Sequence, residues 1–209
     1  MIQTSIFYLN KYLHFFSLKL KSAEMAAKLY KIDGGKDVQQ ALALSGEPMI
    51  EGVFVGSEET EMSVYENWQL NIARNDFAIR FLERWNKTKE ISGTGRPMDG
   101  ILSPIYSLPA YPDYAPVTII YTSIANLLQL STVIIPVTKV DPKLDEITDE
   151  YRKLQPASEI DQKIKDMYVN NPGMFENCSV GLQIMCRRLE EEKAIAMGIV
   201  LENALKSLQ

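Results

Sequence analysis

The stretch SVGLQIMCRRLEEEK, from Ser179 to Lys193, decides what the fold can be. In its first half, small or polar residues alternate with four apolar ones, Val180, Leu182, Ile184 and Cys186. This two-residue period is typical of a β-strand, and Met185 adds apolar surface to the second face. Glu190–Glu192 then predict a helix start, because carboxylates there oppose the positive end of the helix dipole. The stretch therefore predicts a strand, covered on both sides, that runs directly into a helix.

The C-terminal helix is predicted to lie on a core. Its apolar residues recur every three or four positions, at Ala194, Met197, Leu201, Leu205 and Leu208. Gly198 lies on the same face and permits close approach of the helix backbone to a sheet.

Upstream, apolar runs predict a strand at Ile101–Ile105, a helix at Thr118–Leu130 and a second buried strand, carrying Pro136, at Val133–Val140. This β–α–β order, with the strand that follows Ser179, predicts an α/β fold with a few strands of a largely parallel or mixed sheet flanked by helices. So few strands leave open apolar edges, which indicates part of a larger sheet.

The N-terminal half is predicted to be helical. Ser22 is expected to cap a short helix that Gly34 and Gly35 end, and Asp37 is expected to open the next helix. Ser63 and Glu66 have capping-box spacing before one long helix or a bent pair. An apolar stripe on it is interpreted as core: Tyr65, Trp68, Ile72, Ile79, Leu82 and Trp85.

Composition is that of a globular protein of 209 residues, with 46% hydrophobic and 23% charged residues. A net charge of −5 argues against nucleic acid as a partner, because phosphate binding needs clustered Lys and Arg. Cys178 and Cys186 are the only cysteines, and they are interpreted as free thiols in the cytoplasm. No cofactor and no metal is predicted.

Residues 1–21 are treated as a separate segment, dense in apolar residues but interrupted by Lys11, His14, Lys19 and Lys21. They are too broken for a stable membrane span. Three interpretations stay open: a basic amphipathic segment on a membrane, a helix packed on the body, or non-native sequence.

No catalytic residue is predicted. His14, the only histidine, has no serine or cysteine placed to use it. The Gly56-Ser57 and Ser92-Gly93 pairs lack the dense glycine turn around a nucleophile. The carboxylate pairs Asp33/Asp37 and Asp141/Asp145 are interpreted as loop and cap residues rather than as metal ligands.

Five segments in order nevertheless resemble one enzyme family: LYKIDGGKD (29–37), SGEPMI (45–50), MDGILSP (98–104), YTSIANLLQLSTVIIPVTKVD (121–141) and SVGLQIMCRRLEEEK (179–193). The last three are similar to the C-terminal third of the amidase signature family, particularly its fungal acetamidase-like branch, and the first two resemble the segment just upstream in that branch. Residues 22–209 are accordingly expected to be the C-terminal part of an amidase domain.

The resemblance implies hydrolysis of carboxamides by a serine, a second serine on a cis peptide and a lysine, all in the family's N-terminal part. It also implies that Thr122, Ala125 and Asn126 help to wall the acyl pocket. The branch usually has an aromatic at the position of Ala125 and an acidic residue at that of Gln129. An altered pocket and ordinary drift explain these departures equally well.

The leading hypothesis is therefore a truncated or incompletely annotated amidase that is inactive alone, with a small amide as substrate only in a complete enzyme. The competing hypothesis is a non-catalytic fragment that self-associates, or that pairs through its open sheet edges with an N-terminal amidase fragment or a full-length relative.

Overall fold

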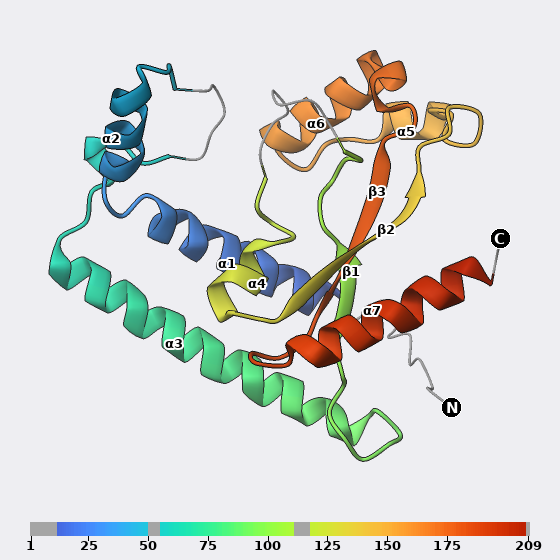
Figure 1. The fold of residues 1–209 in the computed structure, drawn as a ribbon, viewed down its shortest axis with the longest axis horizontal. Coiled ribbons are helices and arrows are strands. Elements are labelled where there is room, and N and C mark those ends of the chain that lie inside the picture. The colour runs from blue at the N-terminus through green and yellow to red at the C-terminus, as the bar shows by residue number, and fades with distance from the viewer. Residues whose placement is uncertain (1–11, 50–54, 111–117, 208–209) are drawn as a thin grey trace.

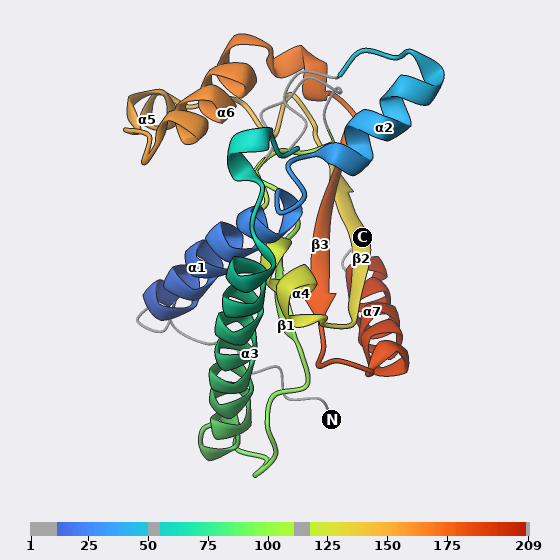
Figure 2. The same cartoon turned by 90° about the vertical axis from the view of Figure 1, so that its left-hand side faces the viewer.

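The computed structural model describes residues 12–49, 55–110 and 118–207, with side chains from residue 20 onwards. Within these ranges a three-stranded sheet is flanked by helices, which confirms the predicted α/β class. Helix α7 (Glu191–Lys206) lies on one side of the sheet, as Figure 2 shows. The other side faces α1 (Tyr12–Tyr30), α3 (Val64–Lys87) and α4 (Ser123–Leu128).

Strand β3 (Ser179–Met185) is the centre of the sheet (Figure 1). It pairs antiparallel with β1 (Ile101–Pro104) on one edge and with β2 (Thr132–Lys139) on the other. Strands β1 and β2 therefore run in the same direction, as a β–α–β unit requires, but β3 is inserted between them. The sequence predicted a largely parallel or mixed sheet, and both described pairings are antiparallel, because chain order does not decide which strands become neighbours.

Two hydrophobic clusters cover the two faces of β3. On one face Ile135, Ile184, Cys186 and Ala194 are buried between the sheet and α7. A Cβ added at Gly198 would lie 3.3 Å from both Val133 Cγ1 and Ile135 Cδ1, which confirms the predicted close approach of this helix. The other face is covered by α3 and α4.

Strand β2 is less buried than predicted. Ile135 is its only buried residue, and Ile134 is 59% exposed. The second edge of β2 also has no neighbour in the described sheet. The pairing with β3 is irregular between Pro136 and Thr138. Proline has no backbone N–H to donate, so an edge strand with a bulge is where it is tolerated.

Helix α3 is one continuous helix that begins with the predicted capping box. Glu66 N donates to Ser63 Oγ at 3.2 Å, and Ser63 N donates to Glu66 Oε2 at 2.8 Å. Its buried residues are Phe77, Phe81 and Trp85, spaced four apart on one face. The predicted core stripe is wrong except for Trp85, since five of its members are between 48% and 67% exposed: Tyr65, Trp68, Ile72, Ile79 and Leu82.

Helix α1 begins well before the predicted cap. Ser22 is inside this helix and fully buried, and its hydroxyl lies 3.2 Å from the Ser123 hydroxyl of α4. The predicted end is confirmed, because Gly34 and Gly35 follow α1 with φ of 68° and 77°. Residues 1–11 of the predicted separate segment lie outside the described residues, and the division after residue 21 stays a prediction.

Helices α2, α5 and α6 lie towards one end of the sheet (Figure 1). Helix α2 (Lys36–Ser45) has no buried residue. The connection from β2 to β3 contains α5 (Asp149–Lys153) and α6 (Glu159–Asn170). The short 3-10 helices are η2 (Glu58–Thr60), η3 (Thr88–Glu90) and η4 (Pro172–Phe175). None of the helices described is both long and apolar enough to cross a membrane.

Replacing Gly198 by leucine is expected to destabilise the fold by about 1–3 kcal/mol or more, because the side chain has no room against β2. Urea unfolding measures the loss. Ala204→Leu is the matched control on the exposed side of α7 and should change stability by less than about 0.5 kcal/mol. Equal effects of the two variants would contradict the close packing of α7 on the sheet.

Candidate functional site

The predicted pocket-wall residues share one turn at the start of α4. Thr122 is the N-cap residue, and its carbonyl accepts hydrogen bonds from the backbone N–H groups of Ala125 and Asn126 at 3.0 and 3.3 Å. Asn126 is exposed, and its Nδ2 donates to the Tyr30 hydroxyl of α1 at 2.7 Å. Ala125 is only 7% exposed. The three residues therefore lie on one helical turn, but they do not face a common space: Ala125 is directed into the core and Asn126 towards α1.

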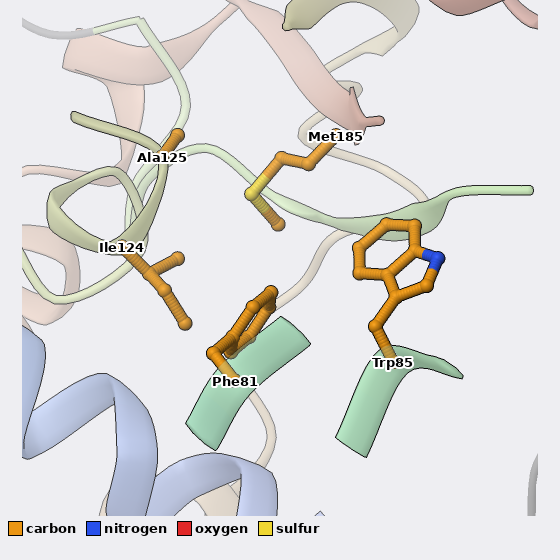
Figure 3. Packing of buried hydrophobic residues seen from close by; sticks show 5 residues of the cluster. All are labelled: Phe81, Trp85, Ile124, Ala125 and Met185. Carbon is orange, nitrogen blue, oxygen red and sulfur yellow. The ribbon is translucent and has the colours of Figure 1, made fainter. Parts of the chain in front are cut away.

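The core behind this turn is the second hydrophobic cluster. Figure 3 shows the side chains of this cluster: Phe81 and Trp85 of α3, Ile124 and Ala125 of α4, and Met185 of β3. The Phe81 and Trp85 rings are 6.0 Å apart and tilted by 53°, within the range of favourable aromatic pairs. The Trp85 Nε1 donates to the Met98 carbonyl at 2.9 Å, so its buried N–H is satisfied. This cluster holds α4 against α3 and the sheet.

Gln183 connects the sheet to the segment before α4. It is 1% exposed, and its Nε2 lies 3.1 Å from Ser103 Oγ, 2.9 Å from the Pro104 carbonyl and 2.8 Å from the Tyr121 carbonyl. One amide group thus joins β3, β1 and the residue that precedes Thr122. Sequence reasoning missed this role, although a lone amide at an inward position of an apolar strand was the available signal.

A compact polar cluster closes the turn from β3 to α7. The Arg187 guanidinium donates to Glu190 Oε1 at 2.6 Å, and the Arg187 backbone N–H donates to Glu190 Oε2 at 3.1 Å. Ser131, which precedes β2, accepts from the Glu190 N–H and donates to the Glu191 carboxylate. The hydrogen bonds from Arg187, with a contribution from Lys193, hold the pKa of Glu190 below its usual value despite partial burial.

A groove of about 220 Å³ lies between α3, the end of α4 and the β3–α7 turn. Its apolar lining includes Phe81, Leu82 and Trp85 of α3. Its basic lining consists of Arg74, Arg187 and Arg188, which the sequence analysis did not bring together. Arg74 Nε donates to the Leu127 carbonyl at 3.0 Å, and Arg187 is paired with Glu190, whereas Arg188 makes no ion pair with any described residue.

The carboxylate pairs have the predicted structural roles. Asp33 accepts from the backbone N–H groups of Gly35 and Asp37 at 2.9 and 3.1 Å, which caps the entry to α2. Asp145 accepts from the Asp141 N–H at 2.9 Å within a loop. Across the described ranges, no three His, Cys, Asp or Glu side chains are grouped as metal ligands would be. The described side chains begin at residue 20, so that of His14 is not among them.

Replacing Gln183 by methionine, which is similar in size, is expected to lower the free energy of unfolding by about 1–3 kcal/mol, because the buried Ser103 hydroxyl and the carbonyls of Pro104 and Tyr121 lose an N–H donor. Gln162→Met, at an exposed position of α6, removes one hydrogen bond to Asp166 and should lower the free energy of unfolding by less than about 0.5 kcal/mol. Urea unfolding of both variants checks this, and equal stability of wild type and Gln183→Met would contradict the proposed link.

The Glu190 carboxylate is expected to make stability depend on pH. Because its pKa is lowered by folding, its stabilising effect is present above the unfolded-state pKa, near the ordinary 4.5, and is lost as the pH falls through the folded-state pKa. Glu190→Gln should therefore be less stable than wild type at pH 7, and the difference should shrink steadily below about pH 4.5. Urea unfolding between pH 3 and 7 measures it.

Glu202→Gln is the control for this pH series, because Glu202 forms an exposed i,i+4 pair with Lys206. Such pairs contribute about 0–1 kcal/mol, so this variant should follow the wild-type curve closely. A Glu190→Gln curve parallel to wild type at every pH would exclude the role given to the Arg187–Glu190 pair.

Comparison with known proteins finds fungal amidases. The chain is 34% identical over 187 residues to a putative amidase, kk1C, of Curvularia clavata, covering 88% of this chain. It is 26% identical over 177 residues to an acetamidase of Emericella nidulans, covering 84% of this chain, and 32% identical over 191 residues to Amidase 1 of Gibberella moniliformis, covering 90%. No protein-family model matches the chain.

The fold comparison agrees. A solved structure of fatty acid amide hydrolase superimposes with a TM-score of 0.77 and 26% sequence identity, over 90% of this chain and 32% of that enzyme. The chain also spans only about a third of the length of the curated relatives, from 31% for the Emericella acetamidase to 35% for Amidase 1. Along most of its length, the chain is therefore similar in sequence to one third of several fungal amidases, and it has the fold of one third of fatty acid amide hydrolase.

Proposed function

We infer that this chain forms the C-terminal part of an amidase-signature enzyme, a hydrolase that converts carboxamides to a carboxylic acid and ammonia or an amine. The proposal rests on the agreement between sequence similarity and fold similarity, each of which covers almost nine tenths of this chain or more. Relatives named amidase and acetamidase match most of this chain, and the fold of fatty acid amide hydrolase matches 90% of it. The composition alone would also suit a binding module, but a binding module unrelated to amidases would not match amidases in both sequence and fold.

The finer part of the proposal is that the 209 residues do not hydrolyse amides by themselves. A serine hydroxyl is a weak nucleophile until a base takes its proton, and the oxyanion that forms needs oriented N–H donors. The serine–serine–lysine relay implied by the resemblance corresponds to no residue of this chain. Thr122, Ala125 and Asn126 contribute to the acyl pocket only when the remainder of the fold is present, with Ala125 acting from the core side.

We also propose that the chain is cytoplasmic and that its sheet continues into the remaining fold. Cys178 and Cys186 are free thiols, which fits the reducing cytoplasm. The outer edges of β1 and β2, which have no neighbour in the described sheet, are where strands of the remaining fold continue it. Residues 22–209 act as one part of an amidase domain, and residues 1–21 lie outside that part.

The purified chain is expected to release no ammonia from acetamide or benzamide above a no-protein control. Addition of the part of the Curvularia clavata amidase that lies outside the matched segment is expected to produce turnover, because it supplies the relay. An enzyme-coupled ammonia assay measures both. Turnover by the chain alone would refute its inactivity, and the absence of turnover from a stable mixture of the two parts would count against amide hydrolysis.

A further inference from the structure

The outer face of α3 carries an unusual apolar stripe. Its members recur at alternating three- and four-residue spacing and have large exposed fractions: Tyr65 67%, Trp68 63%, Ile72 53%, Ile79 58% and Leu82 48%. Asn75 fills the position between Ile72 and Ile79. This is the heptad spacing of a helix that packs lengthwise against another surface. The inner face of the same helix is already occupied by the core around Phe81 and Trp85.

Exposure on this scale indicates a contact surface. Isolated exposed apolar side chains are common, but a row that includes a tryptophan and a tyrosine, interrupted only at Asn75, is typical of an interaction site. The row runs along α3, the long helix beside α1 and α4 in Figures 1 and 2, on a different side from the buried Phe77, Phe81 and Trp85. At its C-terminal end Leu82 also lines the groove beside Arg188.

The charges beside the stripe are mixed in sign. Along one flank the exposed side chains of Asp76, Arg80 and Glu83 alternate in charge. On the side of the groove the lining is basic and includes Arg188, which makes no ion pair with any described residue. The surface therefore fits a partner that presents both charges to the first flank and acidic groups to Arg188.

We propose that the α3 stripe is the surface against which the other two thirds of an amidase fold packs. This rests on the proposed function. The superposition with fatty acid amide hydrolase covers 90% of this chain but only 32% of that enzyme. About two thirds of the enzyme's fold therefore lies outside the matched part. The apolar side chains of the stripe are exposed to solvent, and neither the sheet nor another described helix covers them. The remaining two thirds of the fold is large enough to do so.

The test is association in trans. The full chain, carrying an affinity tag, is co-expressed with the part of the Curvularia clavata amidase outside the matched segment, and the complex is measured by co-purification and by titration. Trp68→Glu and Ile79→Glu should each weaken binding at least about tenfold, as expected when a central apolar contact becomes charged. Leu44→Glu, at a 92% exposed position on α2, should leave binding within about twofold. Arg188→Glu should weaken binding more at low salt than at high salt.

Several outcomes would overturn this interface. Binding of Trp68→Glu and Ile79→Glu at wild-type strength would do so, provided that circular dichroism shows both variants folded. Failure of the wild-type chain to associate would also overturn it, as would a dimer of the chain that Trp68→Glu abolishes, because the occupant would then be a second copy.

The two proposals fail in different ways. A complex that is sensitive to Trp68→Glu but releases no ammonia retains the interface and rejects amide hydrolysis. Turnover that is insensitive to both stripe variants retains the proposed function and rejects the interface.

Discussion

Strand β3 needs a neighbour on each edge and a cover on each face, and the rest of the structure depends on that constraint. A strand with apolar residues on both sides is stable only when both are removed from water. Strands β1 and β2 satisfy its edges, α7 covers one face, and the cluster of α3 and α4 covers the other. Each of these elements is positioned by its contact with β3 or with a neighbour of β3.

Gln183 shows how this packing reaches the candidate site. A buried amide costs free energy unless its hydrogen bonds are made, so its three oxygen partners must stay close to it. One of them is the Tyr121 carbonyl, next to Thr122. The position of the α4 turn is therefore determined by the interior of the sheet, and its three predicted pocket residues keep their places only while the central strand keeps its register.

Local signals were sufficient for much of the fold. The capping box at Ser63, the glycines that end α1 and the close approach at Gly198 depend on neighbouring residues or on one face of a helix, and all three were predicted. The partners of Gln183 were not, because Tyr121 lies 62 residues away in sequence. The stripe of α3 was misread for a related reason: periodicity reports which residues share a face, but not what covers that face. Ser22 misled the prediction because a small polar residue suits a cap and a tight helix contact equally well.

The edge strand β2 also bears on how the isolated chain behaves in solution. A long, regular, apolar edge is a template on which further strands add and fibrils grow. In β2 the row of backbone N–H donors is interrupted at Pro136, and the pairing with β3 is irregular between Pro136 and Thr138. Only short segments on either side of Pro136 can accept a foreign strand in register, so the proline that this edge tolerates also limits the uncontrolled addition of strands to it.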